Sequence, residues 1–551
     1  MNAERLLQHY ERLADAPEAI ERLRRFILDL AVRGKLAPQN PNDEPARDYK
    51  TSDHLGAPLE LPGNWQWTEI GEQLELLNGM AFKPTDWAKA GLRIVRIQNL
   101  NNAEAPFNFC SPDMARERSL IDNGSFLISW SGTPGTSFGA FIWDRGPAVL
   151  NQHIFRCDFK TKAFFPPFLR LAINGRLDEM IAKAHGGVGL QHITKGKLEA
   201  LLIPLPPLAE QHRIVAKVDE LMGLCDRLDA ARHTREATRD RLAAASLARL
   251  NTPHPDTFHA DARFALDALP ALTTRPDQIK QLRQTILNLA VRGKLVPQDP
   301  NDEPITTTLS NAMARRAALV KAKKVRAKKL DGYGGLEADP NLPSSWVTER
   351  LGNLVDPENT ISYGVLVPGE EVPDGVPFVR AQDLALSGHP ERPNKTIAPE
   401  VEQAYARTRL RGGEILVCVV GSIGKLGVVP QSWAGANIAR AVARISPISE
   451  ILREYLLIVL RSDPAQTYFS EATRTLAQPT LNVGLIEQTP IPLPPLAEQR
   501  RIVARVDALM TLCDQLEASL TTAAKKRGRL LDALLAEALT PSEAIRLEAA
   551  E

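Results

Sequence analysis

The stretch LIPLPPLAEQHRIVAKVDELMGLCD, residues 202–226, returns almost unchanged as PIPLPPLAEQRRIVARVDALMTLCD at residues 490–514. In both copies two prolines end an extended run, and apolar residues then recur at alternating spacings of four and three. This spacing places one apolar seam along one side of a helix, the pattern with which helices pack as coiled coils. Each copy therefore predicts the end of a strand, a proline stop and a long helix. The seam positions are Ile214, Val218, Leu221, Cys225 and Leu228 in the first copy and Ile502, Val506, Leu509, Cys513 and Leu516 in the second.

The helix that follows each copy is predicted to be long. No proline occurs between residues 208 and 250, and the Thr-Pro pairs at 252–253 and 540–541 keep the offset of the repeat. Two helices of about equal length result, roughly 65 Å each at ~1.5 Å per residue. With facing seams, they predict an antiparallel intramolecular coiled coil.

A second repeat lies upstream of each copy. IERLRRFILDLAVRGKLAPQNPNDEPA at residues 20–46 matches IKQLRQTILNLAVRGKLVPQDPNDEPI at residues 279–305. Its apolar residues keep helical spacing, Gly34 and Gly293 suit the helix end, and PNDEP is typical of a turn. The two repeats together identify the chain as a tandem duplication.

The segments between the repeats barely resemble each other but share landmarks in the same order. LPGNW (residues 61–65) corresponds to LPSSW (342–346), and IVRIQNL (94–100) corresponds to FVRAQDL (378–384). Short β-branched and aromatic runs broken by Gly, Pro and Asn predict strands and turns. The predicted fold is therefore α+β, with two mixed α/β domains joined by the two long antiparallel helices in a pseudo-twofold arrangement. The predicted divisions are an N-terminal helical region at residues 1–50, a first mixed domain at 51–205, a central long helix with the helical repeat at 206–305, a basic linker at 306–340, a second mixed domain at 341–493 and a C-terminal long helix at 494–551.

Composition limits the classes of protein to which the chain can belong. The 551 residues carry a net charge of +1, so a nucleic-acid surface must come from local clusters of charge. The five cysteines show neither a CxxC nor a Cys/His ligand spacing, and neither a metal site nor a disulfide framework is indicated. The first residues are charged and no run of 18 apolar residues occurs, so a cytoplasmic protein is expected.

Catalytic motifs are not found. The nearest match to the Asn-Pro-Pro-aromatic motif of amino methyltransferases is FPPF at residues 165–168, and phenylalanine cannot hydrogen-bond an amine. GSIGK at residues 421–425 fails the spacing of a phosphate-binding loop. No catalytic, cofactor-binding or metal-binding residue is therefore assigned to this chain.

Polar residues with hydrogen-bond donors occupy the predicted turns of both mixed domains. Arg, Lys, Asn and Gln pair with base edges or hold phosphates, so these turns are candidates for reading DNA. For each residue singly, a solvated side chain or a turn cap is the alternative. The candidates are Arg96, Gln98, Asn99, Asn101, Ser131, Thr133, Thr136, Gln191, His192, Lys195 and Lys197 in the first domain and Arg380, Gln382, Ser422, Lys425, Arg440, Arg474, Thr475, Gln478 and Asn482 in the second.

A basic run lies between the second PNDEP turn and the second mixed domain. Residues 305–330 contain eight Lys and Arg residues and no acid. Such a run either contacts phosphates or forms a solvated tether, and the sequence leaves both open. The phosphate-contact candidates are Arg315, Arg316, Lys321, Lys323 and Lys324.

The combination of these features resembles the specificity subunit of type I restriction-modification systems. The features are two divergent domains that each end in PLPPLAEQxRIVAxVD and a long helix, the LAVRGKLVPQ repeat, and the approach TLNVGLIEQTPIPLPPL at residues 480–496. The resemblance covers essentially the whole chain. It implies that the divergent segments are target-recognition domains, each reading one half of a bipartite site in double-stranded DNA.

The resemblance also implies partners and cofactors. Two methyltransferase (modification) subunits would dock on the helix pair, which would set the spacing of the half-sites, and endonuclease/translocase (restriction) subunits would join through them. S-adenosylmethionine, ATP and Mg would be bound by those partners, with no cofactor and no catalysis in this chain. Because the two domains differ, an asymmetric site is expected. The alternatives are a chain with its own nuclease or methylase activity and a coiled-coil scaffold that does not bind DNA.

Overall fold

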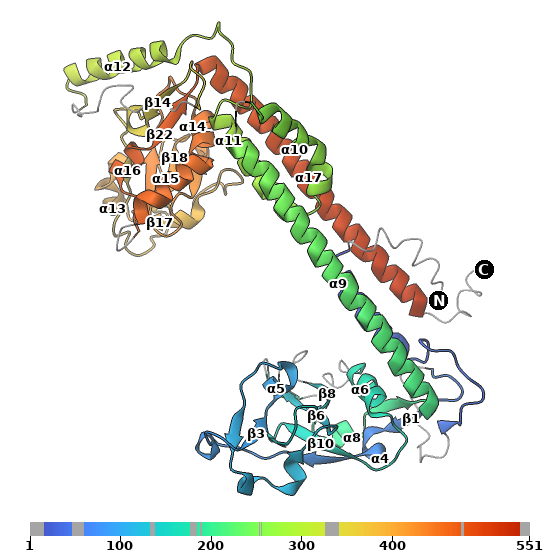
Figure 1. Cartoon of the computed structure of the whole chain (residues 1–551). Helices are drawn as coiled ribbons and strands as arrows, with labels where there is room; N and C mark the ends of the chain where they lie inside the picture. The colour runs from blue at the N-terminus through green and yellow to red at the C-terminus, as the bar shows by residue number, and fades with distance from the viewer. Residues whose placement is uncertain are drawn as a thin grey trace, which may run out of the picture. The chain divides into compact units, whose positions relative to one another are not determined.

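The chain folds as two compact units, each holding one mixed α/β domain (Figure 1). The computed structural model describes residues 16–46, 60–132, 138–176, 185–187, 190–252, 254, 256–325, 341–474 and 479–539. Unit 1 comprises residues 1–235 and 524–551, and unit 2 comprises residues 236–523. The duplication expected from the repeats is therefore present in the fold.

Two helices of 44 residues each pass from one unit into the other. Helix α9 (Leu208–Asn251) begins in unit 1 and ends in unit 2, whereas α17 (Leu496–Leu539) begins in unit 2 and ends in unit 1. Both begin directly after a Pro-Pro pair, because the residue before a proline disfavours helical backbone and the strand must end there. The prediction of two long helices of equal length is confirmed.

A buried glutamine joins the first mixed domain to α9. The side chain of Gln211 is fully buried. Its Nε2 donates to the carbonyls of Ala163 at 2.8 Å and Pro206 at 3.0 Å, and its Oε1 accepts from the backbone N–H of Phe165 at 2.8 Å. Each hydrogen bond contributes about 1 kcal/mol net, and a buried backbone group left without a partner costs about 1–3 kcal/mol. The amide therefore holds the domain and the helix start in one geometry.

The second copy of the repeat makes the same joint. Gln499 is also fully buried, donates from Nε2 to the carbonyl of Pro494 at 3.0 Å and accepts at Oε1 from the N–H of Leu452 at 3.1 Å. The PLPPLAEQ repeat thus encodes a connection between domain and helix as well as the helix itself.

An ion pair ties the PNDEP turn of the upstream repeat to the same helix start. Arg213 pairs with Asp43 at 2.5 Å in unit 1, and Arg501 pairs with Asp302 at 2.6 Å in unit 2. Both carboxylates are largely buried, so the pairs are better shielded from water than surface ion pairs. The two sequence repeats of each unit therefore meet at the beginning of its long helix.

The apolar seam of α9 is covered by helix α3 (Ala19–Val32) and by the core of the first domain. Ile214, Val218 and Cys225 are buried in one cluster with Ile27 and Ala31 of α3. Of the other two seam residues, Leu221 packs against this cluster and Leu228 is 37% exposed. The seam residues are mostly buried, as predicted, and within unit 1 they are covered by α3 and the domain core.

Helix α11 (Pro276–Val291) covers the seam of α17 in the same way. Ile502, Val506 and Cys513 are buried in the unit 2 core together with residues of α11 such as Ile286 and Ala290. Leu509 and Leu516 pack against this core. The 4-3 spacing thus defines the buried side of each long helix, and within each unit α3 or α11 covers it. That the two seams face each other as a coiled coil stays a prediction.

Each upstream repeat helix also contacts the end of the other long helix within its unit. In unit 1, Leu531 of α17 is buried with Ala19 of α3, and Arg22 donates to Asp532 at 2.8 Å. In unit 2, Arg275 at the start of α11 pairs with Asp240 of α9 at 2.9 Å. Helices α3 and α11 therefore brace both long helices.

The mixed domains are built from small sheets in corresponding orders. Unit 1 contains four-stranded sheets β2-β10-β6-β8 and β4-β3-β9-β5, a three-stranded sheet β11-β12-β7 and the pair β1-β13. Unit 2 contains the four-stranded sheet β15-β21-β18-β19, the three-stranded sheet β17-β16-β20 and the pair β14-β22. All named strand pairs are antiparallel except β3-β9 and β16-β20, which are parallel. This confirms the predicted α+β class.

The elements of unit 1 not yet bounded are β1 (Gln66–Glu69), α4 (Ile70–Gln73), β2 (Leu74–Asn78), β3 (Leu92–Val95), α5 (Ile97–Asn101), β4 (Asn108–Cys110), β5 (Leu120–Ile121), β6 (Phe126–Ser129), β7 (Ser131–Gly132), β8 (Gly139–Ile142), β9 (Ala148–Leu150), β10 (Ile154–Phe159), α6 (Pro166–Asn174), β11 (His185–Gly187), β12 (Leu190–His192), α8 (Lys195–Glu199) and β13 (Leu202–Leu205). Those of unit 2 are α10 (Phe258–Leu272), α12 (Ile305–Lys321), β14 (Val347–Arg350), β15 (Ser362–Tyr363), β16 (Val376–Val379), β17 (Lys395–Ile397), α13 (Pro399–Gln403), β18 (Ile415–Cys418), β19 (Leu426–Val428), β20 (Asn437–Ile438), β21 (Val442–Ile445), α14 (Arg453–Arg461), α15 (Asp463–Arg474), α16 (Val483–Glu487) and β22 (Pro490–Leu493).

The glutamate of the second PLPPLAEQ copy gives the fold a pH dependence. Burial raises the pKa of the Glu498 carboxyl above its ordinary value, although Gln298 and Trp346 donate hydrogen bonds to it. A raised pKa in the folded state favours folding below the unfolded pKa of about 4.3, and this contribution is lost as pH rises through the folded pKa. Glu498→Gln removes the titration, so the stability of the variant relative to wild type should increase from pH 4 to pH 8.

Calorimetric unfolding midpoints of wild type, Glu498→Gln and a control across this range measure the effect. The control is Glu471→Gln, because Glu471 is exposed on α15 of the same unit. A stability of Glu498→Gln relative to wild type that stays constant or falls as pH rises would contradict the assignment.

Candidate nucleic-acid interface

In unit 1 the two four-stranded sheets meet where the chain leaves β9. The N–H of Met80 donates to the carbonyl of Leu150 at 2.8 Å, and the N–H of Asn151 donates to the carbonyl of Val95 at 3.0 Å. Three segments that are distant in sequence, around residues 79–80, 95–96 and 150–152, thus converge. Arg96, a predicted DNA-reading residue, directly follows Val95 at this place.

Unit 2 repeats this junction with different residues. The N–H of Val365 donates to the carbonyl of Ile438 at 2.8 Å, and the N–H of Ala439 donates to the carbonyl of Val379 at 2.9 Å. The predicted residues Arg380 and Arg440 directly follow Val379 and Ala439. The backbone of the two domains is therefore the same at this junction, whereas the side chains it presents differ.

A further segment joins each junction through short strand pairs. In unit 1 the backbone of β12 pairs with β7, which sets His192 opposite Ser131 and Gln191 opposite Gly132. In unit 2 Val420 bridges Thr480, two residues before the candidate Asn482. Predicted residues from separate loops are thus brought together in each unit.

Comparison with known proteins gives the family. A family model described as the type I restriction modification DNA specificity domain matches residues 62–235 and again residues 343–526. The chain belongs to this family. Each match covers one mixed domain and the first part of the following long helix, so each unit of the chain contains one specificity domain.

Similar proteins match over nearly the full length. The chain is 27% identical over 485 residues to the EcoBI type I restriction enzyme specificity subunit of Escherichia coli, covering 87% of this chain and 86% of that protein. It is also 27% identical over 581 residues to the EcoEI specificity subunit of Escherichia coli, covering 94% of each. A solved chain from a study of complex assembly and conformational transition of the type I R-M system matches at 20% identity and a TM-score of 0.50, covering 87% of this chain and 99% of its own. This last likeness supports the fold.

Several predicted residues of the specificity domains form hydrogen bonds that hold the loops. Asn99 is buried, accepts from the N–H of Arg96 at 3.0 Å and donates to the carbonyls of two following loop residues. Arg380 forms an ion pair with Asp383 at 3.0 Å, and the hydrogen bonds that its guanidinium donates to that carboxylate raise the pKa of Arg380. Asn482 accepts from the N–H of Leu485 and caps α16.

Two predicted lysines also serve the loops. Lys195 Nζ donates to the carbonyl of Leu76 at 2.9 Å, and Lys425 Nζ donates to the carbonyls of Ala381 and Gln382, both at 3.2 Å. For these two lysines the structure matches the alternative named above, a side chain that caps or supports a turn. They orient the loops that carry the exposed candidates.

The other candidates differ in exposure and in how far they are described. Arg96 is half-buried, with its guanidinium 5.9 Å from the ring of Trp87, and Lys197 and Ser131 are also half-buried. Only the backbone of Gln191, His192 and Arg474 is described, and Thr133, Thr136, Thr475 and Gln478 lie outside the described residues. The exposed candidates are Gln98, Asn101, Gln382, Ser422 and Arg440.

The basic segment begins as a helix instead of a linker. Residues 305–321 form α12, which packs on the unit 2 core through Ile305 and Leu309. Arg315 contacts Ser449 at 3.0 Å and Glu450 at 3.3 Å, so part of its charge is compensated. Arg316 is half-buried, and the exposed phosphate-contact candidates are Lys321, Lys323 and Lys324.

Sequence reasoning missed two exposed residues at these loops, Trp87 and Gln152. Trp87 is 46% exposed, and Gln152 follows Asn151 at the junction of unit 1. A signal for Gln152 was present, because it aligns with Arg440 at the same offset of 288 that relates the two PLPPLAEQ copies. No comparable signal marks Trp87.

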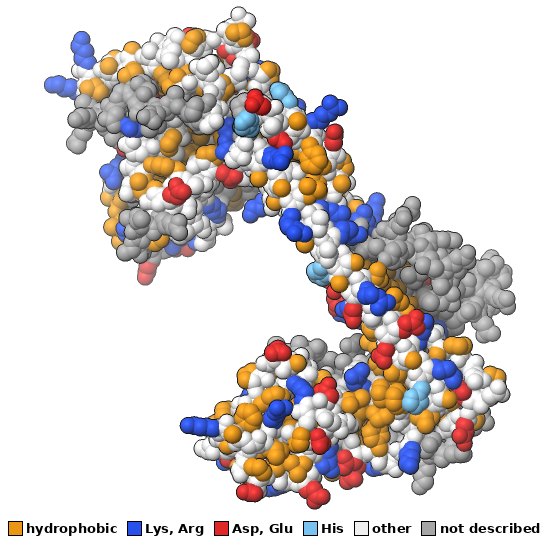
Figure 2. Space-filling view, in the orientation of Figure 1, with side chains coloured by type: hydrophobic (Ala, Val, Ile, Leu, Met, Phe, Trp, Pro, Cys, Tyr) orange, Lys and Arg blue, Asp and Glu red, His pale blue; other side chains and the backbone are white. Residues whose placement is uncertain are grey.

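Figure 2 shows the charged side chains on one face of the specificity domains. Basic and acidic side chains are interspersed on the face shown in Figure 2, in keeping with the net charge of +1.

Among the residues described, no group of three His, Cys, Asp or Glu side chains is placed to hold a metal ion. The five cysteines are buried and unpaired. No helix in the described part of the chain is long and apolar enough to cross a membrane.

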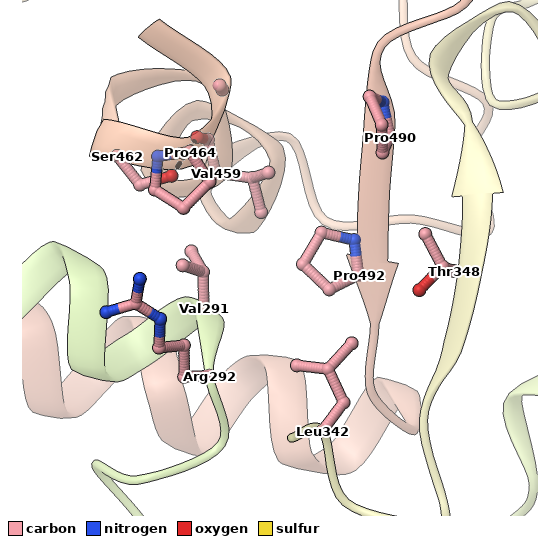
Figure 3. A pocket seen from close by; sticks show the side chains of 10 residues that line it. Val291, Arg292, Leu342, Thr348, Val459, Ser462, Pro464, Pro490 and Pro492 are labelled. Carbon is pink, nitrogen blue, oxygen red and sulfur yellow. Dashed lines mark hydrogen bonds between the residues drawn. The ribbon is translucent and has the colours of Figure 1, made fainter. Parts of the chain in front are cut away.

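A pocket of about 450 Å³ lies in unit 2, away from these loops in sequence and among framework residues (Figure 3). Its walls include Val291 at the end of α11 and Thr348 and Pro492 of the β14-β22 pair. In unit 1 the strand position of Thr348 is taken by Trp67, which likewise pairs with a proline and packs at 5.1 Å against the guanidinium of Arg176. The pocket is thus a place where the two copies of the framework pack differently.

The junction requires glycine at one position. A Cβ on Gly79 would lie 2.2 Å from the carbonyl oxygen of Asn151, and one on Gly364 would lie 1.7 Å from that of Ile438. Both obstacles are backbone atoms, so neighbouring side chains cannot relieve the clash. Gly79→Ala should therefore destabilise unit 1 by about 2–4 kcal/mol, measured as a lowered midpoint of chemical unfolding.

Gly196→Ala is the matched control, since a Cβ there meets no atom within 4 Å. It should leave stability within about 0.5 kcal/mol of wild type or raise it slightly, because alanine favours helices. Equal effects of the two substitutions would show that the close approach at residue 79 is not a constraint.

Proposed function

We propose that this chain is a specificity subunit whose two domains each read one half of a bipartite, asymmetric site in double-stranded DNA. The observation that carries the proposal is the repeated junction. The same backbone hydrogen bonds hold both sets of loops, but different donor-bearing side chains are exposed on them. A common scaffold with different reading groups is the arrangement expected for two unlike half-sites.

The partners follow from the relatives. The EcoBI and EcoEI proteins are specificity subunits of type I restriction enzymes, and by analogy this chain directs methyltransferase and endonuclease subunits to its site. We place methylation and cleavage in those subunits. The purified chain alone should therefore bind DNA but neither methylate nor cut it, and activity of the chain by itself would support the alternative of an enzyme.

A selection from randomised DNA duplexes tests the proposal directly. The full-length chain should enrich two short fixed segments separated by a spacer of constant length. Because contacts to phosphates release counterions, its affinity should fall steeply with salt. Enrichment of no sequence, with no salt-sensitive binding, would support a scaffold that does not touch DNA.

Domain replacement should alter one half-site at a time. Replacing residues 65–204 with the corresponding segment of the EcoBI subunit leaves α9, α17 and the second specificity domain intact. The enriched site should keep one half and the spacer and change the other half completely. The experiment uses the same selection, and a change in both halves would show that the domains do not read independently.

The long helices are proposed to set the spacer, because each of them passes from one unit to the other. Four residues add about one turn, ~6 Å, and should be inserted in both helices, after Arg235 in α9 and after Ala523 in α17. The preferred spacer should lengthen by about two base pairs at ~3.4 Å each. Replacement of four residues at the same places without insertion is the control, and an unchanged spacer in the lengthened chain would refute the ruler.

A further inference from the structure

Gln152 and Arg440 occupy equivalent places in the two specificity domains. Each is the second residue of a four-residue turn, which is closed by the N–H of Ile154 on the carbonyl of Asn151 at 3.1 Å and by the N–H of Val442 on the carbonyl of Ala439 at 2.9 Å. The turns connect β9 to β10 and β20 to β21. The equivalence therefore rests on backbone geometry in each unit as well as on sequence offset.

The segment next to each turn confirms the correspondence. The N–H of Trp130 donates to the carbonyl of His153 at 3.4 Å, and the N–H of Val419 donates to the carbonyl of Ala441 at 2.8 Å. The carbonyls of the same two residues accept in turn. The N–H of Ile193 donates to the carbonyl of Trp130 at 3.0 Å, and the N–H of Leu481 donates to the carbonyl of Val419 at 3.0 Å. Residues 152 and 440 therefore stand at the meeting point of the same loops.

The turns are held firmly while the two side chains are exposed. The N–H of Arg440 donates to the carbonyl of Val365 at 2.9 Å, which fixes the backbone of the residue itself. Within the described residues its guanidinium has no hydrogen bond or ion pair, in contrast to Arg380, which is paired with Asp383. Gln152 is exposed as well, with its Nε2 3.2 Å from the Nε2 of His153. A rigid turn that carries an exposed donor is suited to reach a ligand without loss of backbone entropy.

The side chains that pack next to the two turns differ in size. In unit 1 the ring of His153 lies 5.5 Å from that of Trp130 and fills the space beside Gln152. The corresponding pair in unit 2 is Ala441 and Val419, which are smaller. Arg440 thus has smaller neighbouring side chains than Gln152. The surfaces at the two turns therefore differ in both shape and hydrogen-bonding chemistry.

We propose that Gln152 and Arg440 are specificity-determining residues, Gln152 for an adenine in one half-site and Arg440 for a guanine in the other. The chemistry is that of direct readout in the major groove. The glutamine amide pairs with N6 and N7 of adenine, and the guanidinium donates two hydrogen bonds to O6 and N7 of guanine. The inference rests on the proposed function and adds to it the positions and bases concerned.

Reciprocal substitutions test the assignment with the full-length chain in the selection from randomised duplexes. Arg440→Gln should change one guanine to adenine in one half-site, with a preference of roughly 5- to 150-fold, and leave the other half unchanged. Gln152→Arg should make the opposite change in the other half-site. Arg505→Gln and Gln515→Arg, both at exposed positions of α17, are the controls and should enrich the wild-type site.

The selection distinguishes a failure of the base assignment from a failure of the proposed function. If wild type enriches a bipartite site and the two variants enrich that same site, the assignment is overturned while the function stands. Uniform weakening on all sequences, with circular dichroism showing a folded chain, would assign the two residues to phosphate contacts and overturn it as well. If wild type enriches no bipartite site, the proposed function fails and the inference with it.

Discussion

The buried amide at the start of each long helix is the interaction on which the rest of the architecture depends. Gln211 and Gln499 bind backbone groups on both sides of the joint between domain and helix. Loss of either amide would leave buried backbone groups without partners, at about 1–3 kcal/mol each. Because the amide, the proline stop and the seam occur in one repeat, a single stretch of sequence fixes where a domain ends and in which direction its helix leaves.

The braced helix starts separate the constant parts of the molecule from the variable ones. Helices α3 and α11 bury the seams and reach both long helices within their units, and the PNDEP turns pair with Arg213 and Arg501. These contacts join the repeat segments, the long helices and the domain cores. The exposed candidate residues of the junction loops take part in none of them, so these residues can differ between the two copies without cost to the framework.

The sequence was sufficient to predict the duplication, the α+β class and the two helices of equal length. These features depend on proline stops and helical spacing, which act locally. It was not sufficient to predict which helices cover the apolar seams of α9 and α17 within each unit. Periodicity states which side of a helix is buried, and the covering helix follows only from tertiary packing. Residues of the upstream repeat such as Ile27 and Ile286 carry the complementary apolar pattern, but many pairings satisfy that pattern equally well.

The candidate interface shows a similar division between what could be predicted and what could not. Residue type directed attention to the loops, but could not distinguish Asn99, which is buried as a turn cap, from Arg440, which is exposed. That distinction depends on nearby acceptors such as the carbonyls of Ala105 and Pro106, to which Asn99 donates and whose positions only the fold provides. Gln152 aligns with Arg440 at the offset of the repeat, but only the shared turn shows that the two residues occupy equivalent places in their domains.

A hydroxyl-radical footprint of the full-length chain on its enriched DNA site tests the central claim most directly. Two domains that read separate half-sites should protect two short segments of the duplex, with a cleavable spacer between them that remains constant from site to site. A single protected segment would contradict the account, since it would mean that the two specificity domains do not each bind DNA.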